Sequence, residues 1–396
     1  MKKTISILGS TGSIGLNALK IFTKKRKLFE LNILAANKNY NLICKQITQF
    51  KPKIFVVNDL EVFEKVNKKF KNSKVKIIKK INIKDKYLRK SDITIAAIPG
   101  IAGLIPTIQM MKKSKKILIA NKESVICGWN LIKKEAIKNN TKVIPIDSEH
   151  FSIMKLLENQ NIKYVKKIYL TASGGPFLNY HISKLKHVKP NDAINHPKWK
   201  MGKKISVDSA TLMNKVLEVI EAHKIFSINF EKIKIIIHPE SLIHAIIEFK
   251  NGLYKFIYHE TSMLVPLANA MFDDNLEINE ILEKKTSNKK KSFVFQKLNF
   301  LNIDKRKFPI IKLIKKANEH ESSPIIINAA NEILVDQFLE KKIAFNSIYE
   351  YLLLVLKDRN YSKYAIKKPK NIDQVFEIDE WSRNTTYEKI IAKTNV

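Results

Sequence analysis

The chain has 396 residues, is 45% hydrophobic and 28% charged, and carries a formal net charge of +35. Such a length and composition predict a globular protein with a large core and two or three domains. No run of eighteen apolar residues occurs, which excludes a transmembrane helix. The start of the chain, "MKKTISILGS", passes directly into a strand pattern without a signal-peptide h-region. Its two cysteines, Cys44 and Cys127, are too few for a disulfide framework or a thiolate zinc site. We therefore expect a cytoplasmic protein.

The basic charge invites a nucleic-acid interpretation, but the type of cation argues against it. Only five of the 72 basic residues are arginine, and the lysines are scattered among Ile and Asn along the whole chain. Nucleic-acid readers favour arginine, whose planar fork matches guanine and phosphate. No zinc-finger or RNP-type aromatic pattern is present. We expect solvated lysine surfaces and no specific nucleic-acid partner.

The first 147 residues alternate short β-branched runs with longer amphipathic stretches. This alternation is typical of βαβ units and predicts an α/β, doubly wound parallel sheet, a Rossmann-like domain over 1–147. Parallel sheets bind ligands at the carboxyl ends of their strands. The unusual motifs "GSTGSIG", "ANKN", "IPG", "ANKES" and "IDSEH" all follow predicted strands, so we expect a site at this edge. The predicted strands are 4–9, 31–37, 53–58, 93–98, 116–121 and 142–147, with helical patterns over 14–22, 102–111 and 129–138.

The pattern changes after about residue 150. Four further strands are predicted, with an "NG" hairpin turn between the last two. These strands, with the helical pattern over 204–226, predict a central α+β domain at 148–272. The Lys- and Asn-rich stretch 273–307, with "EKKTSNKKKS" in its middle, is interpreted as a linker. Helical periodicity then predicts a closing helical domain at 308–396. The four strands are 166–173, 232–241, 244–250 and 253–259.

Gly9, Gly12 and Gly15 open the first helix directly after the first strand. Glycines there allow a tight turn and a close approach of the backbone to a pyrophosphate, which the helix N-terminus attracts. The spacing is G-x-x-G-x-x-G, and the alternative is a glycine turn without a ligand. The strand before it and the helix after it favour the dinucleotide site. The second strand ends in Ala36-Asn37-Lys38-Asn39, where NAD-selective sites carry an acid. Without that acid NADP is preferred, although Lys38 by itself could be one more surface lysine.

Asp147 and Glu149 follow the sixth predicted strand. In extended chain, residues i and i+2 point the same way, so these carboxylates would offer oxygen ligands to Mg²⁺ or Mn²⁺. Alternatively, Asp147 or Ser148 caps a helix that starts near Phe151. A third ligand could come from 204–226, where a helix capped by Asp208 or Ser209 would group polar residues on one side. That group could equally be an ordinary solvated face. It contains Asn214, Lys215, Glu218 and Glu221.

The motifs taken together are more specific than each alone. "GSTGSIG", "ANKES", "DSEH", "SGGPF", "HPKWKMGKKISVDSATLMNK", "IHPES" and "NAANEI" occur in this order. The chain closely resembles the 1-deoxy-D-xylulose 5-phosphate reductoisomerase family from about residue 4 to residue 390. The resemblance implies an NADPH- and metal-dependent enzyme of the non-mevalonate isoprenoid pathway. It would rearrange 1-deoxy-D-xylulose 5-phosphate, most simply by retro-aldol cleavage and re-addition, and reduce the resulting aldehyde to 2-C-methyl-D-erythritol 4-phosphate.

The resemblance also implies roles for individual residues. Trp199 and Met201 would lie on a mobile loop over the site, and His244 near it. The family is homodimeric, so a homodimer is expected. The implied metal ligands are Asp147, Glu149 and Glu218. The implied substrate contacts are Lys122, Ser148, Glu149, Ser173, His196, Ser209, Asn214, Lys215 and Glu218. The implied NADPH contacts are Thr11, Gly12, Ser13, Ile14, Asn37, Lys38, Asn39, Asn121, Glu123 and Gly202.

The sequence departs from the family at several places. Asn37 and Ala172 stand where glycine is usual, and in "HETSMLVPLANAM" Ser262 and Leu264 replace an Asp and an Arg. The last two put a loop anchor or subunit contact in doubt. A rival interpretation is another NADP-dependent two-domain oxidoreductase, such as a semialdehyde dehydrogenase with Cys127 as nucleophile. Cys127 has no adjacent base and lies in an apolar stretch, so a buried core role is favoured.

Overall fold

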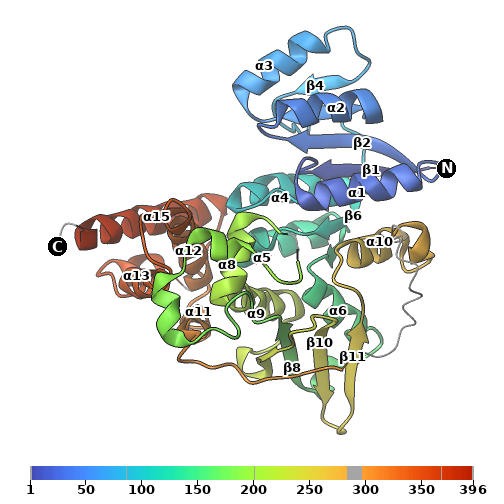
Figure 1. Ribbon diagram of the computed structural model, residues 1–396. Coiled ribbons are helices and arrows are strands. Elements are labelled where there is room, and N and C mark those ends of the chain that lie inside the picture. Colours follow the sequence, from blue (N-terminus) through green and yellow to red (C-terminus); the bar gives the residue numbers. More distant parts are fainter. Residues whose placement is uncertain (1, 86, 200, 283–296, 367, 395–396) are drawn as a thin grey trace. The chain divides into compact units, whose positions relative to one another are not determined.

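The computed structural model describes residues 2–85, 87–199, 201–282, 297–366 and 368–394 (Figure 1). It divides into two compact units. The first comprises residues 1–124 and 130–151 and the described part of 262–292, and the second comprises 125–129, 152–261 and the described part of 293–396. No described helix is long and apolar enough to cross a membrane. The stretch "EKKTSNKKKS", at the middle of the predicted linker, lies outside the described residues.

The first unit is built on a seven-stranded parallel sheet in the order β4-β3-β2-β1-β5-β6-β7. From β1 the chain adds strands first on one side and then on the other. Because parallel crossovers are right-handed, the helices of the two halves cover opposite faces, and the order reverses between β1 and β5. The strands are β1 Lys3–Leu8, β2 Phe29–Ala36, β3 Ile54–Val57, β4 Lys76–Ile78, β5 Ser91–Ala96, β6 Ser114–Ile119 and β7 Lys142–Pro145.

The predicted doubly wound sheet is confirmed, and each predicted strand of this unit is present. Only β4 was missed, because this edge strand is three residues long and only half-buried, so it lacks the apolar run of its neighbours. The helices along this part of the chain are α1 Ser13–Lys24, α2 Tyr40–Phe50, α3 Leu60–Lys69, α4 Leu104–Met111, α5 Lys122–Lys138 and α6 Ser148–Leu157.

A later segment returns to this sheet. Helix α10, Leu264–Phe272, packs on α1 and β6. Lys116 of β6 donates to the carbonyl of Ala270 at 2.9 Å and pairs with Asp273 at 2.7 Å. Leu264, one of the residues at which the sequence departs from the family pattern, is buried at the start of α10. An apolar side chain therefore suits this position. Residues 262–272 therefore group with the N-terminal sheet rather than with the α+β unit, and the three-domain division of the chain stays a prediction.

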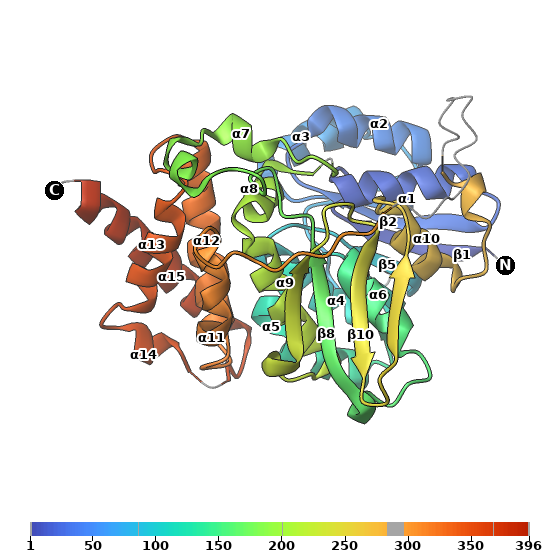
Figure 2. The same cartoon turned by 60° about the horizontal axis from the view of Figure 1, so that its bottom comes forward.

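The second unit contains a four-stranded sheet in the order β11-β10-β8-β9. The β10–β11 pair is antiparallel around Gly252, which adopts a φ of 85° as the predicted "NG" hairpin requires. Helix α9, Met213–Phe226, packs against β8 and β9, and Figure 2 shows this sheet in front of it. The strands are β8 Val165–Ala172, β9 Ile233–Ile237, β10 Ile243–Phe249 and β11 Tyr254–Tyr258, so all four predicted strands are present.

The single helix predicted within 204–226, with Asp208 or Ser209 as its cap, proves to be two helices, and both of these residues lie inside the first. Helix α8, Lys203–Thr211, ends at Leu212, whose φ of 65° and ψ of 12° are left-handed, and α9 begins at the next residue. An apolar periodicity that runs through both helices cannot reveal a single left-handed residue. A short helix, α7, Pro190–Ile194, precedes them.

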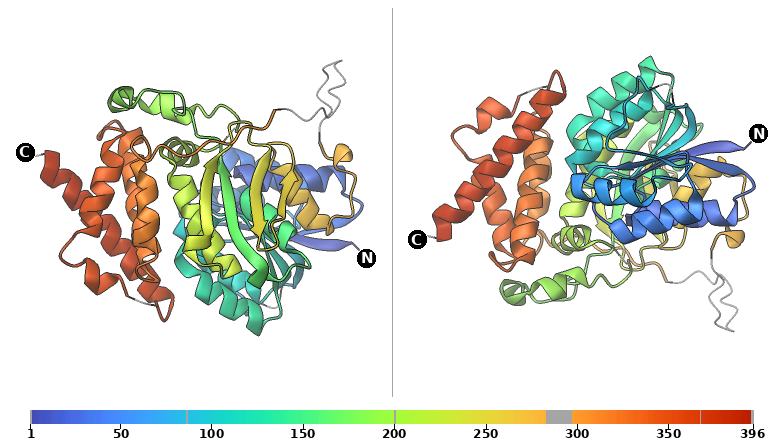
Figure 3. Two further views of the ribbon diagram at one scale, coloured as in Figure 1. Left: turned by 90° about the horizontal axis from the view of Figure 1, so that it is seen from below. Right: turned by 90° about the horizontal axis from the view of Figure 1, so that it is seen from above.

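The end of the chain is helical, as predicted. Helices α12 and α15 pack together, and α13 packs on both, as the orange-to-red part of Figure 3 shows from two sides. The helices are α11 Leu313–Ala317, α12 Ser323–Leu339, α13 Ser347–Leu356, α14 Tyr361–Tyr364 and α15 Ile372–Thr394.

Candidate functional site

The glycine turn after β1 is shaped by close packing. Gly9 has a φ of 84°, and a Cβ there would lie 2.4 Å from the carbonyl oxygen of Ala97, just beyond β5. A Cβ on Gly15 would lie 2.3 Å from the carbonyl oxygen of Gly9. Gly12, the N-cap of α1, is exposed. A Cβ there would have only the Gly9 oxygen within 4 Å, at 3.4 Å. Two glycines therefore bring strand and helix together, and the third leaves the helix N-terminus open to an anion.

The end of β2 carries no acid. Asn37, Lys38 and Asn39 are all exposed after the buried strand. Asn39 is also the N-cap of α2, because its side chain accepts a hydrogen bond from the backbone N–H of Leu42 at 3.1 Å. Thr11, Ser13 and Ile14 lie at the start of α1, also partly or fully exposed. The end of β2 therefore presents an exposed lysine and no carboxylate.

The start of α5 lies beyond β6. Asn121 caps this helix by accepting from the N–H of Ser124, and its amide donates to the carbonyl oxygens of Ile98 and Gly100. Its side chain thereby joins the ends of β5 and β6. Lys122 and Glu123 follow at the helix start, and both are buried, with 6% and 8% of their surfaces exposed. Charged side chains are rarely so deeply buried unless they are paired.

Asp147 lies between β7 and α6. One of its carboxylate oxygens is 3.0 Å from Nζ of Lys122, and the other is 3.4 Å from Nδ1 of the fully buried His150. Burial would raise the pKa of Asp147, but the Lys122 ammonium and the His150 ring outweigh it and hold that pKa well below its usual range. The carboxylate is therefore ionised and ready to act as a hard oxygen ligand.

The capping interpretation of "DSEH" is confirmed for Asp147, and the metal-ligand interpretation stays a prediction. Asp147 accepts from the backbone N–H of Glu149 at 3.3 Å, as a capping residue does, while its other oxygen faces Lys122. The expectation of extended chain is wrong: α6 begins at Ser148, so Glu149 lies in the first helical turn. There the Ser148 hydroxyl donates to the Glu149 carboxylate at 2.7 Å.

In the second unit, the "SGG" turn after β8 lies against the end of α8. Gly175 has a φ of 66°, and a Cβ there would be 2.7 Å from the carbonyl oxygen of Ser209. Its backbone N–H donates to the Ser173 hydroxyl at 3.1 Å. The absence of a side chain at Gly175 thus lets the backbone near Ser173 approach that of Ser209. A pocket of about 480 Å³ beside this turn is lined by Ser173 and Gly175 together with Asn195 and Lys198.

His196 joins this turn to the loop that carries Trp199. Its Nδ1 accepts the backbone N–H groups of Lys198, at 3.1 Å, and Trp199, at 2.9 Å. The proton of the neutral ring therefore belongs on Nε2, which donates to the Ser173 hydroxyl at 2.9 Å. Burial, aided by the positive charge of Lys215, lowers the pKa of His196 to about 4. The ring is neutral at physiological pH and orients Ser173.

The first turns of α9 carry the remaining predicted residues. Lys215 lies 2.5 Å from one carboxylate oxygen of Glu218, and the Asn214 amide donates to the other. Lys215 and Glu218 are 6% and 1% exposed, so the solvated-face alternative is wrong. The left-handed Leu212, itself buried, starts α9 at Met213, and the backbone N–H of Lys215 donates to its carbonyl at 3.1 Å.

The structure therefore assembles two sets of predicted residues. In the first unit, Lys122 contacts Asp147, and Ser148 contacts Glu149. In the second unit, Ser173 contacts His196. Glu218 contacts Asn214 and Lys215. Gly202, predicted to contact NADPH, is the exposed N-cap of α8, and a Cβ there would meet nothing within 4 Å.

Sequence reasoning missed a buried contact that supports Ser209. Asn331 of α12 donates to Asp208 of α8 at 2.8 Å, Lys204 lies 2.9 Å from the other oxygen, and both Asn331 and Asp208 are fully buried. "NAANEI" was noted as a motif, but nothing local to the sequence indicates that its second asparagine reaches α8.

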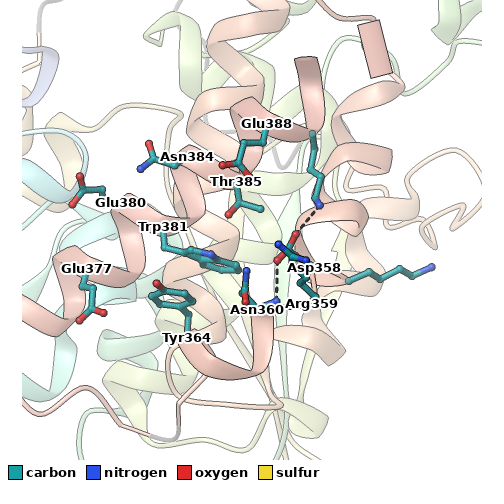
Figure 4. A pocket seen from close by; sticks show the side chains of 12 residues that line it. Asp358, Arg359, Asn360, Tyr364, Glu377, Glu380, Trp381, Asn384, Thr385 and Glu388 are labelled. Carbon is teal, nitrogen blue, oxygen red and sulfur yellow. Dashed lines mark hydrogen bonds and ion pairs between the residues drawn. The ribbon is translucent and has the colours of Figure 1, made fainter. Parts of the chain in front are cut away.

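Another pocket, of about 670 Å³, lies in the helical part of the chain (Figure 4). There Tyr364 of α14 stacks on Trp381 of α15, with ring centres 4.5 Å apart, and Lys389 pairs with Asp358 at 2.6 Å. None of the predicted site residues lines this pocket.

An acid-free dinucleotide turn, an ionised aspartate at a strand end and a buried Lys–Glu pair define the class of NADP-dependent oxidoreductases with a candidate metal site. Models of 1-deoxy-D-xylulose 5-phosphate reductoisomerase match residues 5–128, and its C-terminal domain models match 143–226 and 260–385. The reductoisomerase of Pelagibacter ubique is 43% identical over 96% of this chain and 97% of its own. That of Thermodesulfovibrio yellowstonii is 40% identical over 98% and 100%. The chain belongs to the 1-deoxy-D-xylulose 5-phosphate reductoisomerase family.

Solved structures agree with this assignment. A crystal structure of the reductoisomerase in complex with NADPH, fosmidomycin and magnesium has a TM-score of 0.89 and 28% identity, over 99% of both chains. The Zymomonas mobilis enzyme in complex with NADPH has a TM-score of 0.85 and 30% identity, over 98% of this chain and 99% of its own. The dehydrogenase alternative is thereby excluded. Cys127 is a buried residue within α5, 3.9 Å from the Asn328 amide.

Proposed function

We propose that the chain catalyses the NADPH- and divalent-metal-dependent conversion of 1-deoxy-D-xylulose 5-phosphate to 2-C-methyl-D-erythritol 4-phosphate, in isoprenoid precursor synthesis. The family assignment supports the reaction. The observation that carries it in this chain is the pairing of two ionisable carboxylates, Asp147 and Glu218, with the lysines Lys122 and Lys215. Both lysines are buried, as a site that excludes water requires.

The glycine turn is proposed to hold NADPH. The open N-terminus of α1 suits the pyrophosphate, and the acid-free end of β2 suits a 2′-phosphate. NADPH is bound in two solved relatives. When bound, the cofactor supplies the hydride for the reduction. The proposed contacts are Thr11, Gly12, Ser13, Ile14, Asn37, Lys38, Asn39, Asn121, Glu123 and Gly202.

Asp147, Glu149 and Glu218 are proposed as ligands of a Mg²⁺ or Mn²⁺ ion. The donor set fits, because three carboxylates are the hard oxygen ligands that these ions prefer. When bound, the ion supplies Lewis-acid polarisation of the substrate carbonyl. Without the ion, Lys122 and Lys215 neutralise Asp147 and Glu218. Loading the ion would release part of that charge to the anionic substrate.

The substrate phosphate is proposed to bind where the "SGG" turn meets α8. Hydroxyl donors at a glycine turn, an amide and a buried ammonium make a suitable anion pocket. His196 keeps its proton on Nε2 and so holds Ser173 in one orientation. Lys122 and Ser148 are proposed to contact the substrate hydroxyls, and the loop carrying Trp199 and Met201 to exclude water. The proposed phosphate contacts are Ser173, His196, Ser209, Asn214 and Lys215.

We also propose a cytoplasmic homodimer. Cys44 and Cys127 are both buried, and two cysteines are too few for a disulfide framework, which suits a reducing compartment. Strand β11 is a sheet edge on which Tyr254 and Phe256 are 58% and 48% exposed, and such an apolar edge favours pairing with another chain. Light scattering of the wild type and of Phe256→Glu tests this. A dimer in the first and a monomer in the second is expected, and a monomeric wild type refutes it.

The function is tested by following NADPH oxidation with 1-deoxy-D-xylulose 5-phosphate, with and without Mn²⁺, in the wild type and in Glu218→Gln. We expect turnover that requires the metal and falls on the order of 10³-fold in the variant, because several kcal/mol of charge stabilisation are lost. Glu231→Gln, at an exposed position, is the control and should match the wild type. Activity that survives chelation of the metal, or that persists in Glu218→Gln, would refute the metal site.

A further inference from the structure

Two histidines from neighbouring strands stack in the second unit. His244 is the second residue of β10, and His259 directly follows β11. The backbone N–H of His259 donates to the carbonyl of Leu242 at 3.0 Å, which sets His259 opposite Leu242. His244, two residues further along, is then its diagonal neighbour on the same face of the sheet. The two rings lie 4.0 Å apart at an angle of 16°.

The His259 ring is fixed in place. It is 8% exposed, and its Nδ1–H donates to the carbonyl of Glu260 at 2.8 Å. Burial lowers its pKa from 6.5, so the ring is neutral at physiological pH. Its Nε2 has no hydrogen-bond partner in the described parts of the chain. The stack on His244 is thus a contact of a ring whose orientation is already fixed by its backbone hydrogen bond.

The His244 ring has a second aromatic neighbour, Trp199. The two ring centres are 6.0 Å apart at 68°, an edge-to-face arrangement. The backbone N–H of Trp199 is bound by His196, which in turn orients Ser173. A continuous series of contacts thus runs from His259 to the proposed phosphate pocket.

We propose that His259 is a positioning residue: its ring supports the His244 ring, which seats Trp199 beside the substrate pocket. This inference rests on the proposed function only for its kinetic consequence. A purely structural role for His259 would change stability without moving Trp199.

His259→Ala and His259→Phe separate these roles, with His223→Ala as the matched control. His223 is also stacked on an aromatic ring, at 4.1 Å from Phe230, its Nδ1 also bonds a backbone carbonyl, and burial lowers its pKa as well. We expect His259→Ala to raise the substrate KM about tenfold, below the ~10²-fold that a misplacement of about 1 Å can cost, with a smaller change in kcat. His259→Phe, which keeps an aromatic face, should restore KM, and His223→Ala should leave it unchanged.

A second measurement does not need turnover. The fluorescence of Trp199, obtained as the difference between each protein and the same protein carrying Trp199→Phe, should become more accessible to acrylamide in His259→Ala but not in His223→Ala. Unchanged KM and unchanged quenching in a folded His259→Ala protein would overturn the inference, as would equal damage by His259→Phe. A wild type without turnover whose quenching still depends on His259 would refute the proposed function and leave the positioning role standing.

Discussion

The two sheets present their functional groups in different ways. In the seven-stranded sheet, Gly9, Asn121 and Asp147 each lie one or two residues beyond the end of a strand, so the backbone itself delivers them to the edge. In the four-stranded unit, Ser173 also follows a strand, but its partners come from a loop, from α8 and from α9. A side-chain hydrogen bond joins Ser173 to His196 of the loop, and Lys215 pairs with Glu218 within α9. A parallel sheet therefore predefines its site, whereas the mixed sheet depends on buried side-chain contacts.

The largest effect is expected for a substitution in the seven-stranded sheet, where the backbone itself places the functional groups. Gly9→Ala combines a positive φ with a Cβ 2.4 Å from the Ala97 oxygen. We expect it to lower the free energy of unfolding by more than about 2 kcal/mol and to abolish NADPH binding. Denaturant unfolding and NADPH titration measure the two quantities.

Gly12→Ala is the control for this substitution, because the backbone φ is −81° and the space is nearly open. Its unfolding free energy should stay within about 0.5 kcal/mol of the wild type. NADPH affinity should still fall, since the methyl group stands where the pyrophosphate is proposed to approach. Equal loss of stability in both variants would mean that the turn is not held by its packing on β5.

A smaller effect is expected in the four-stranded unit, where side-chain contacts hold the functional groups. Asn331→Ala removes the hydrogen bond to Asp208 and leaves a buried carboxylate with Lys204 alone. We expect a loss of about 1–3 kcal/mol of unfolding free energy and a raised substrate KM, because Asp208 precedes Ser209. Urea unfolding and steady-state kinetics test both.

Asn328→Ala, one turn earlier on α12, is the matched control. Asn328 is equally buried, but it bonds Glu332 at 3.2 Å rather than any residue of α8. It should lose stability and keep its KM. A raised KM in both variants would show that the helical part of the chain acts on the site through general stability and not through the Asp208 contact.

The residue patterns alone predict well where the functional groups of the seven-stranded sheet lie. For the four-stranded unit, the functional groups are predicted only through the resemblance to the family. The alternation of apolar runs and turns is enough to locate the ends of the strands. It therefore also places Gly9, Lys122 and Asp147 at the edge of the sheet. The residues 208–218 are different, because the pattern predicts one helix with a solvated polar face. In the structure Leu212 breaks the helix and Glu218 is buried. Burial of a polar face depends on tertiary packing, which no local periodicity records.

The missed contacts share this cause. Asn331 reaches Asp208 across 123 positions of the chain, and the His244–His259 stack depends on the β10–β11 register, which is irregular between Ile243 and Ile246. A regular Asn-Gly hairpin would set His244 directly opposite His259, whereas the structure sets His259 opposite Leu242 and stacks the two rings along the diagonal. The start of α6 at Ser148 was missed for a simpler reason: the capping Asp147 and the strand end adjoin, so one residue serves both elements.

The smallest expected effect is the pH dependence of the loop held by His196. The pKa of this ring is about 4 in the folded chain, against an ordinary value of 6.5. Between these values the unfolded chain binds the extra proton, so this group's contribution to stability is fully present above about pH 6.5 and is lost as the pH falls towards 4. Because the ring is partly exposed, we expect on the order of 1 kcal/mol between pH 7.5 and 5.

Urea unfolding at several pH values, compared between the wild type and His196→Gln, measures this contribution. The variant should lose that part of the pH slope, since glutamine carries no titrating ring. Stability falls with pH because a proton on Nδ1 of His196 would face the backbone N–H groups of Lys198 and Trp199. In the neutral ring, Nδ1 accepts hydrogen bonds from both of these groups. Acid should therefore release the Trp199 loop before it unfolds the strand-end groups of the first sheet. Identical slopes in the two proteins would show that His196 does not hold the loop through Nδ1.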